Sequence, residues 1–168
     1  METPTLDLDF VRSYFPALQR DFAFMDNAGG SQTLKPVVDK LSEYLLNYDV
    51  QHGASYSVSQ EAVAKVNFAT REMAKYVNAK DPKEIVMSSS STMLFRILSL
   101  TLSKSWQPGD EVITTNSEHE SNCSPWTDLA DKGIVVKIWE VNPETQELDI
   151  NDLKALLTER TKLVTIVH

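Results

Sequence analysis

Short apolar runs rich in β-branched residues alternate with segments of helical periodicity through the second half of this chain. The predicted strands are EIVMS (84–88), EVITTN (111–116), IVVKIWEV (134–141) and KLVTIV (162–167). The predicted helices are STMLFRILSLTLSK (91–104), SNCSPWTDLADKG (121–133, closed by Gly133) and INDLKALLT (150–158). Strands that alternate with helices are joined by right-handed crossovers, so this pattern predicts an α/β fold with a mostly parallel sheet.

The first half of the chain is predicted to be mainly helical. Residues 6–18 predict a short helix that stops near Pro16, and the segments 35–49 and 59–79 predict two long helices. Residues 22–33, FAFMDNAGGSQT, predict a short strand followed by a glycine turn. These helices lie outside the strand–helix alternation, so we expect them to cover the sheet or to contact a partner.

Length and charge narrow the class of protein. A chain of 168 residues fits one domain, or one domain with an appendage. The net charge of −8, without any Lys/Arg-dense run, argues against a nucleic-acid or membrane partner. No apolar run approaches the ~20 residues of a membrane span, and METPTLDLDF lacks the features of a signal peptide. The single cysteine, Cys123, indicates a reducing compartment, so we expect the cytoplasm and leave the mitochondrion open.

Polar segments follow the predicted strands, where ligands bind in an open α/β sheet. They are SSSST (88–92), NSEHESN (116–122) and the terminal His168. The serines precede a helix, whose first N–H groups are unpaired and carry partial positive charge, so they could form a phosphate cup. A plain helix cap with spare serines is the alternative. The glycines and the lysine of a Walker loop are absent.

His119 lies between two carboxylates in the second polar segment. It could act as a general base, stack flat on a ring, or be an ordinary surface histidine, which the spacing alone favours. A metal site needs more ligands, and the only other histidines, His52 and His168, stand at separations that match no standard zinc motif. We therefore predict no metal site.

Two further features each have two interpretations. Gly29 and Gly30 could let the backbone approach a ligand or a neighbouring subunit, or they could form a plain turn. Cys123 is predicted in the first turn of a helix, where its pKa would fall and make it a nucleophile. The favoured alternative is a small residue that packs the helix.

Taken in order, four segments resemble the class V aminotransferase family. They are FMDNAGGSQTLKPVVDKL, EIVMSSSSTMLFR, PGDEVITTNSEHESNCSPW and ELDINDLKALLTERTKLVTIVH, within a resemblance that runs from about residue 9 to residue 168. More narrowly, they are similar to the cysteine desulfurase and selenocysteine lyase branch of the fold-type I enzymes, which depend on pyridoxal 5'-phosphate (PLP). The resemblance implies a three-layer α/β fold, here truncated, with an N-terminal helical segment (1–22) and an incomplete PLP-binding large domain (23–168).

The resemblance also implies roles for individual residues. Ser91 and Thr92, with Ser90 at a position where the family has glycine, match the loop that holds the PLP phosphate. His119 matches the histidine that stacks on the pyridine ring and assists proton transfer.

Other matched positions belong to the substrate side of the family's site. Ala28 and Gly29 match a loop there. His52 replaces the arginine of a His-Arg-Gly motif, so a substrate contact by that arginine is not carried over.

Several family motifs have no counterpart in this chain. They include a Val-Ser-Asn segment after VTIVH, an Asp on the ring nitrogen and the Ser-x-His-Lys motif whose lysine forms the internal aldimine. PLP chemistry needs that lysine and that carboxylate, and Cys123 is not at the family's sulfur-accepting position. We therefore expect either a fragment of a longer enzyme or a truncated product of marginal stability.

The resemblance implies a parent enzyme that is a homodimer and acts on an amino acid through a PLP aldimine. Removal of sulfur or selenium from cysteine or selenocysteine is the favoured reaction, and transamination or epimerisation is the alternative. A second alternative, for the chain taken literally, is a non-catalytic homologue that binds anions or a full-length relative.

Overall fold

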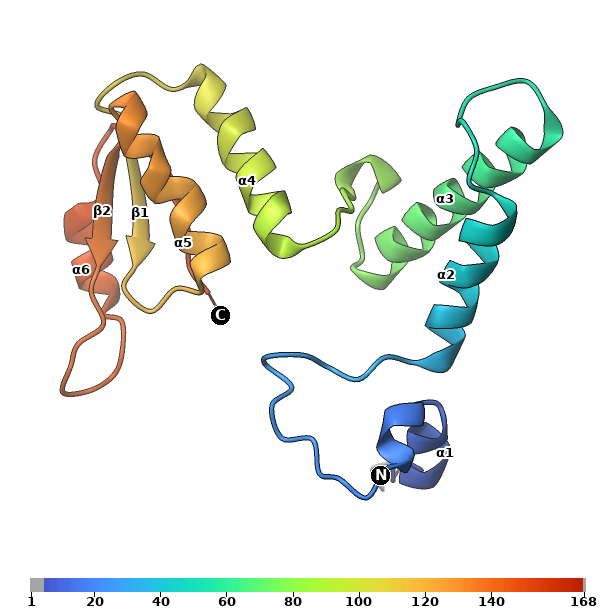
Figure 1. Ribbon diagram of the computed structural model, residues 1–168. Helices are drawn as coiled ribbons and strands as arrows, with labels where there is room; N and C mark the ends of the chain where they lie inside the picture. Colours follow the sequence, from blue (N-terminus) through green and yellow to red (C-terminus); the bar gives the residue numbers. More distant parts are fainter. Residues whose placement is uncertain (1–4, 168) are drawn as a thin grey trace. The chain divides into compact units, whose positions relative to one another are not determined.

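The computed structural model describes residues 5–167 and divides the chain into two compact units, Met1–Glu84 and Ile85–His168. Figure 1 shows the helices of the first unit, and the small sheet and surrounding helices of the second. The predicted division of the chain at residue 22 stays a prediction.

The described part of the first unit is helical. Asp7 caps the first helix by accepting a hydrogen bond from the Phe10 N–H at 2.9 Å, and Pro36 lies in the first turn of the second, where its missing N–H costs nothing. All the helices predicted in this half are confirmed. The elements are α1 (Leu8–Ser13), a 3-10 turn (Pro16–Gln19), α2 (Lys35–Asn47), α3 (Ser57–Tyr76) and a second 3-10 turn (Pro82–Glu84).

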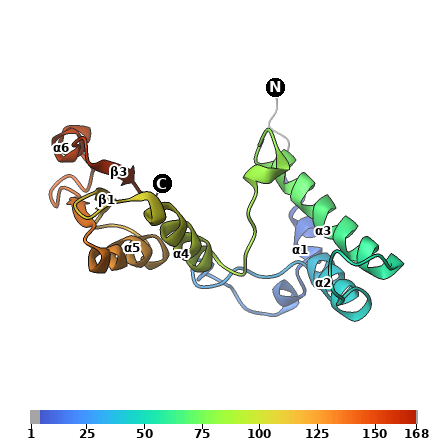
Figure 2. The same ribbon diagram turned by 90° about the horizontal axis from the view of Figure 1, so that it is seen from above.

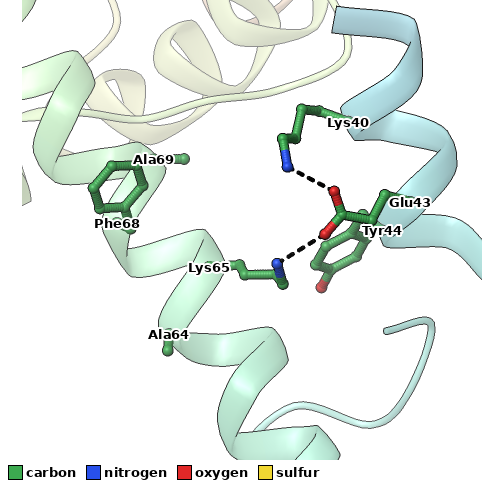
Figure 3. Close-up of a pocket in the computed structure, with 7 residues that line it drawn as sticks. All are labelled: Lys40, Glu43, Tyr44, Ala64, Lys65, Phe68 and Ala69. Carbon is green, nitrogen blue, oxygen red and sulfur yellow. Dashed lines mark hydrogen bonds and ion pairs between the residues drawn. The ribbon is translucent and has the colours of Figure 1, made fainter. Parts of the chain in front are cut away.

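Ion pairs link α2 to α3 (Figure 3). Glu43 of α2 lies 2.7 Å from Lys40 and 3.2 Å from Lys65 of α3. The Lys65 ammonium also lies 4.4 Å from the centroid of the Tyr48 ring. Hydrogen bonds from Lys40 and then Lys65 lower the pKa of Glu43, and the bond to Glu43 raises the pKa of Lys65. Since these groups are well exposed, each pair contributes little to stability.

The strand predicted within residues 22–33 is wrong. The backbone there is irregular, and a turn follows at residues 27–29. Phe22 and Met25 are well exposed, and within the described residues no strand lies alongside to pair with this segment. Apolar side chains at alternate positions favour an extended backbone, but a strand also needs a partner for its N–H and C=O groups. The predicted glycine turn is confirmed.

The second unit is built around a parallel three-stranded sheet of order β2-β1-β3. Figure 2 shows the same unit from above. Val112 at the centre of β1 pairs with Val136 of β2 and Leu163 of β3, so the central strand is covered on both edges. The elements are α4 (Ser91–Leu102), β1 (Glu111–Thr115), α5 (Glu120–Thr127), β2 (Val135–Trp139), α6 (Ile150–Leu156) and β3 (Thr161–Val164), with 3-10 turns at Ser103–Ser105 and Asp128–Lys132.

A small apolar core joins the sheet to α5. Its buried members are Val112, Trp126, Leu129 and Ile134, and Phe95 of α4 is among the half-buried residues that pack against them. Each such side chain contributes about 1.5–3 kcal/mol when it is fully buried. On the other side of the sheet, the Trp139 indole N–H donates to the Asp149 carbonyl at the start of α6, at 3.0 Å.

Gly133 ends the α5 region as predicted. Its φ of 78° is left-handed, and a Cβ there would lie 3.0 Å from Pro108 Cβ. Both the backbone angle and the close approach require glycine.

The prediction of a strand at residues 84–88 is wrong, and the sheet has three strands in place of four. Residues 85–88 carry the apolar, β-branched composition of a strand, yet within the described residues no strand pairs with them. Val86 is 69% exposed and Met87 50% exposed. An apolar, β-branched composition is compatible with a strand, but a strand forms only where a neighbouring strand provides hydrogen-bond partners. The predicted α/β fold with a parallel sheet is confirmed.

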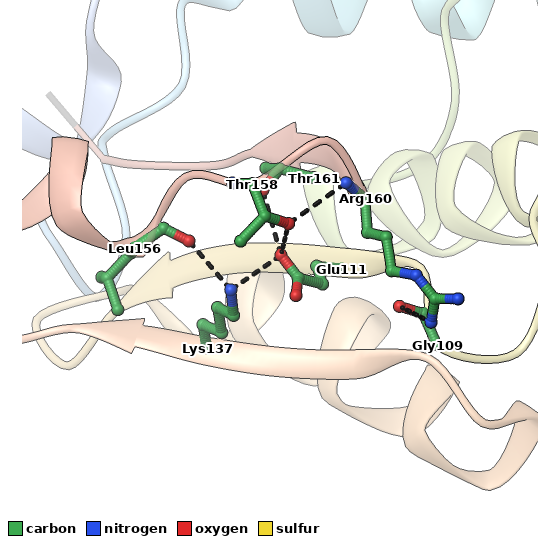
Figure 4. A network of polar contacts seen from close by, with 7 residues as sticks. All are labelled: Gly109, Glu111, Lys137, Leu156, Thr158, Arg160 and Thr161. Atoms are coloured by element: carbon green, nitrogen blue, oxygen red, sulfur yellow. Dashed lines mark hydrogen bonds and ion pairs between the residues drawn. The ribbon is translucent and has the colours of Figure 1, made fainter.

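A polar cluster ties the start of β1 to both neighbouring strands (Figure 4). Glu111 accepts hydrogen bonds from Lys137 of β2 and from Thr158, each at 2.7 Å, and from Thr161 of β3 at 3.1 Å. The Lys137 ammonium also donates to the Leu156 carbonyl at 2.9 Å. These contacts, led by Lys137, hold the pKa of Glu111 below its usual range. The cluster lies at the opposite end of β1 from the polar loop that carries His119.

Candidate functional site

The predicted phosphate segment forms the N-terminus of α4. Ser90 is the N-cap residue, and its hydroxyl accepts a hydrogen bond from the Met93 N–H at 3.2 Å. Ser91 and Thr92 are exposed, and within the described residues their N–H groups and hydroxyls have no hydrogen-bond partner. Two backbone donors and two hydroxyls therefore remain available at the positive end of a twelve-residue helix.

His119 is the N-cap residue of α5. Its Nδ1 accepts a hydrogen bond from the Ser121 N–H at 3.1 Å and lies 2.8 Å from the Ser121 hydroxyl. Because Nδ1 accepts from a backbone donor, the neutral ring carries its proton on Nε2. The side chain is exposed, so the orientation of the imidazole is fixed locally while the ring stays accessible.

The structure places Ser90–Thr92 and His119 at the same end of the second unit. Figure 1 shows α4 and α5 both beginning at the end toward which the strand arrows point, and Arg96 of α4 pairs with Asp128 after α5 at 2.6 Å. This is the edge of a parallel sheet where ligands bind. His168, which the sequence also placed at this edge, lies outside the described residues.

Sequence reasoning missed a polar network directly beside His119. Glu118 accepts hydrogen bonds from the Asn122 amide at 2.7 Å, from the Thr115 hydroxyl at 2.9 Å and from the Val167 N–H at 2.9 Å. Asn122 in turn accepts from the Trp126 indole at 3.2 Å and from the Thr165 hydroxyl at 2.7 Å. The spacing of four between Glu118, Asn122 and Trp126 is a signal that could have indicated one helix face.

Cys123 does not have the reactivity that its helix position predicted. It lies in the first turn of α5 and is partly buried. Burial first, and then the carboxylates of Glu120 and Glu118, raise the pKa of its thiol. The expected lowering of this pKa is therefore wrong, because burial and two nearby carboxylates disfavour the charged thiolate. A thiol of this kind suits the packing role that the sequence favoured.

Ala28 and Gly29 lie in a tight turn of the first unit. The Gly29 N–H donates to the Asp26 carbonyl at 3.2 Å and to the Asp26 carboxylate at 3.3 Å. A Cβ on Gly29 would lie 2.7 Å from Asp26 Oδ2. A side chain at this position would displace the exposed Asp26 carboxylate from its hydrogen bond with the Gly29 N–H.

His52, also in the first unit, lies in the loop between α2 and α3. Its Nε2 is 2.7 Å from the Tyr44 hydroxyl. The buried Ser59 clamps the same loop, because its hydroxyl donates to the Gln51 carbonyl at 2.7 Å and accepts from the Ala54 N–H at 3.0 Å. The structure thus holds the His52 ring by a hydrogen bond to Tyr44.

Two further expectations concern absences. In the described residues, 5–167, no group of three or more His, Cys, Asp or Glu side chains is arranged to hold a metal ion. No helix in that part of the chain has the length and apolar character that crossing a membrane demands.

The chain belongs to the class V aminotransferase family, whose model matches residues 23–168. An aminotransferase-like protein of Gibberella zeae, FGM3, is 41% identical over 100% of this chain and 42% of its own length. A probable cysteine desulfurase of Synechocystis is 34% identical over 94% of this chain and 39% of its own length. The chain therefore spans well under half the length of the curated relatives that it matches.

Solved structures show the same relationship. A cysteine desulfurase of Thermococcus onnurineus aligns over 98% of this chain and 41% of its own, with a TM-score of 0.84 and 28% identity. A cysteine desulfurase of Escherichia coli aligns over 96% of this chain and 41% of its own, with a TM-score of 0.77 and 26% identity. The predicted fold class and family resemblance are both confirmed.

Class V aminotransferases and cysteine desulfurases depend on PLP, and the residues present fit the phosphate of that cofactor. An oxyanion needs several converging donors, and Ser91 and Thr92 offer both N–H groups and hydroxyls at the N-terminus of α4. Ser90 is committed to capping the helix, so it contributes less than its two neighbours.

Proposed function

We propose that this chain provides the phosphate-binding and ring-contacting part of the PLP site of a cysteine desulfurase-like enzyme. The observation that carries the proposal is the set of unpaired donors on Ser91 and Thr92, at the same sheet edge as the exposed imidazole of His119. Membership of the class V aminotransferase family over residues 23–168 supports it.

Each of these residues has a distinct role in the proposal. Ser91 and Thr92 would hold the phosphate through their N–H groups and hydroxyls, with the partial positive charge of α4 behind them. His119 would lie against the pyridine ring, its orientation set by the Ser121 N–H, and its Nε2 could pass a proton. When bound, PLP supplies an electron sink for bond cleavage at the amino-acid α-carbon.

The residues matched to the substrate side keep that role in the proposal. Ala28 and Gly29 stand in a turn that the Asp26 carboxylate stabilises, and His52 is held by Tyr44. The substrate we propose is cysteine or selenocysteine, from which the whole protein would remove sulfur or selenium. Relatives named as cysteine desulfurases support this choice.

Titration of the isotope-labelled chain with PLP, followed by amide NMR, tests the cofactor site. We expect the Ser91 and Thr92 amide signals and the His119 ring signals to shift together. Removing both hydroxyls by Ser91→Ala and Thr92→Val should weaken binding roughly a hundredfold to ten-thousandfold, since each of the two hydrogen bonds to a charged group contributes about 1.5–3 kcal/mol.

Ser88→Ala is the matched control, because Ser88 belongs to the same serine run but precedes the helix. Binding that Ser91→Ala/Thr92→Val weakens no more than Ser88→Ala does would contradict the proposal. So would PLP-induced shifts that leave the Ser91 and Thr92 amides unchanged.

Transamination is the second candidate, favoured by the aminotransferase-like relative that is 41% identical. The two reactions leave different products from cysteine in the presence of PLP. A desulfurase yields alanine and sulfane sulfur, whereas a transaminase yields a keto acid and pyridoxamine phosphate. Product analysis on the whole protein distinguishes them.

We also propose a homodimer in a reducing, cytoplasmic compartment. The single cysteine supports the compartment. Exposed apolar side chains at helical spacing on α2, which are Val37, Val38, Leu41 and Leu45, support association with a second copy. Light scattering on the wild type and on Leu41→Glu checks the dimer, which the charged variant should weaken.

A further inference from the structure

Two segments far apart in the sequence meet at the side chains of Glu118 and Asn122. Glu118 belongs to the loop between β1 and α5, directly before His119, and Asn122 lies one turn into α5. Their partners Thr165 and Val167 follow β3. The network therefore joins the loop that carries His119 to the backbone that leaves the neighbouring strand.

Two groups in this network, the Trp126 indole N–H and the Val167 N–H, can only donate hydrogen bonds. They fix which atom donates and which accepts in the other hydrogen bonds. The Trp126 indole N–H donates to Asn122 Oδ1, which turns the Asn122 Nδ2 toward Glu118. The Val167 N–H donates to the other oxygen of Glu118. Both oxygens of Glu118 must therefore accept, which a carboxylate can do and an amide cannot.

The same side chain holds the loop on both sides of His119. Glu118 accepts from the Thr115 hydroxyl at the end of β1 and from the amide of Asn122 in α5. The His119 carbonyl accepts from the Asn122 N–H at 2.8 Å. With its neighbours tied to the strand and to the helix, His119 has little freedom to move relative to the sheet edge.

We propose that Glu118 is a positioning residue that couples the orientation of His119 to the segment after β3, through an Asn122 amide oriented by Trp126. The inference deepens the proposed cofactor site and rests on it for its function, since His119 is the side chain proposed to contact the ring. The side-chain hydrogen bonds of Glu118 in the described residues go to Thr115, Asn122 and Val167 and not to the phosphate residues, so it acts through His119.

Glu118→Gln tests the polarity of the network in the 168-residue chain without PLP. The amide group that it introduces would face the Asn122 amide or the Val167 N–H, so one donor would lose its acceptor. We expect the Val167 amide to exchange with solvent roughly tenfold faster and the His119 ring nitrogen signals to shift. Glu144→Gln removes the same charge from an exposed loop and should change neither signal.

The double variant Glu118→Gln/Asn122→Asp is the decisive measurement. It exchanges carboxylate and amide between the two positions at constant net charge. The amide introduced at position 118 would donate to the carboxylate introduced at position 122. That carboxylate would also accept from Trp126 and Thr165, so every donor would again have an acceptor. We expect the double variant to restore the slow solvent exchange of the Val167 amide and the wild-type His119 ring signals. Glu118→Gln and Asn122→Asp should each lose both when made singly.

The proposal is overturned if the double variant shows no more Val167 protection and no more of the wild-type His119 ring signals than the single variants do. The same criterion applies if Glu118→Gln alone fails to fold. A purely structural role would lower stability in Glu118→Gln and leave the His119 ring signals of the folded state unchanged, which also overturns it. PLP binding by the wild-type chain is measured in a separate titration. If the wild type does not bind PLP while the swap restores the signals, the proposed function fails and the coupling stands.

Discussion

At the scale of the residue, His119 performs a local structural task as well as the proposed ring contact. Its Nδ1 caps α5 through the Ser121 N–H, so replacing it by alanine removes both the cap and the ring. His119→Ala should lower the free energy of unfolding by about 0.5–2 kcal/mol. It should also abolish the change in PLP absorbance that a stacked ring produces.

His119→Asn separates the two effects, because asparagine caps helices well but has no aromatic ring. We expect near wild-type stability from urea unfolding together with the same loss of the PLP spectral change as in His119→Ala. Wild-type PLP spectra in both variants would contradict the ring contact.

Thr114 carries the clearest structural cost in the core. Its side chain is fully buried in β1, and within the described residues its hydroxyl has no hydrogen-bond partner. Thr114→Val replaces that hydroxyl by a methyl group of similar size. Since a buried unsatisfied polar group costs about 1–3 kcal/mol, we expect a gain of about 1 kcal/mol, measured by urea unfolding.

The matched control is Thr161→Val, in which the hydroxyl removed is one that donates to Glu111 at 3.1 Å. This variant should lose stability where Thr114→Val gains it. Destabilisation by Thr114→Val would show that the buried hydroxyl does have a partner.

At the scale of the element, local sequence signals predicted the secondary structure correctly wherever the backbone N–H and C=O groups of a segment bond to each other. The helices α2 and α4 were predicted from their apolar spacing and α3 from its content of helix-forming residues, all of which are local signals. The run at residues 85–88, IVMS, is more apolar than β3, TKLV, yet of these two segments only β3 pairs with β1. No local sequence pattern distinguishes the two segments, because strand pairing depends on whether another strand lies alongside.

The loop that holds His52 gives an element-scale prediction. Ser59 is fully buried, and its hydroxyl bonds both the Gln51 carbonyl and the Ala54 N–H. Ser59→Ala leaves two backbone groups without partners, so we expect a loss of about 1–3 kcal/mol. Proteolysis should also become faster within residues 51–54.

Ser57→Ala provides the comparison, because Ser57 is exposed at the start of α3. The prediction fails if the two variants are cleaved at the same rate within the loop.

At the scale of the whole molecule, the candidate site was only partly predictable. Ser91, Thr92 and His119 stand out because they follow strand-like runs, and the order of motifs identified the family. The contact between Glu118 and Val167 was not predictable, since Val167 is 49 residues further along the chain. The raised pKa of the Cys123 thiol was not predictable, because it depends on burial and on neighbouring carboxylates that the sequence does not state.

The final prediction concerns the acid stability of the folded chain. Lys137, followed by Thr158, lowers the pKa of Glu111 from its ordinary value of 4.5. A lowered folded-state pKa means that the unfolded chain binds the proton more tightly. The contribution of Glu111 is therefore complete above the unfolded-state pKa and is lost as the pH falls through the folded-state value. Glu111→Gln should melt below the wild type at pH 7, and the gap should narrow progressively below about pH 4.5.

Thermal unfolding of the wild type and Glu111→Gln between about pH 7 and about pH 3 measures this gap. Glu144→Gln, which removes a charge from an exposed loop position, corrects for the change in net charge and should track the wild type throughout. Because Lys137 joins Glu111 to the Leu156 carbonyl at the end of α6, the loss should be seen in the sheet and in α6 together. A gap between wild type and Glu111→Gln that stays constant down to the lowest pH would show that the ion pair and hydroxyl contacts do not favour the carboxylate.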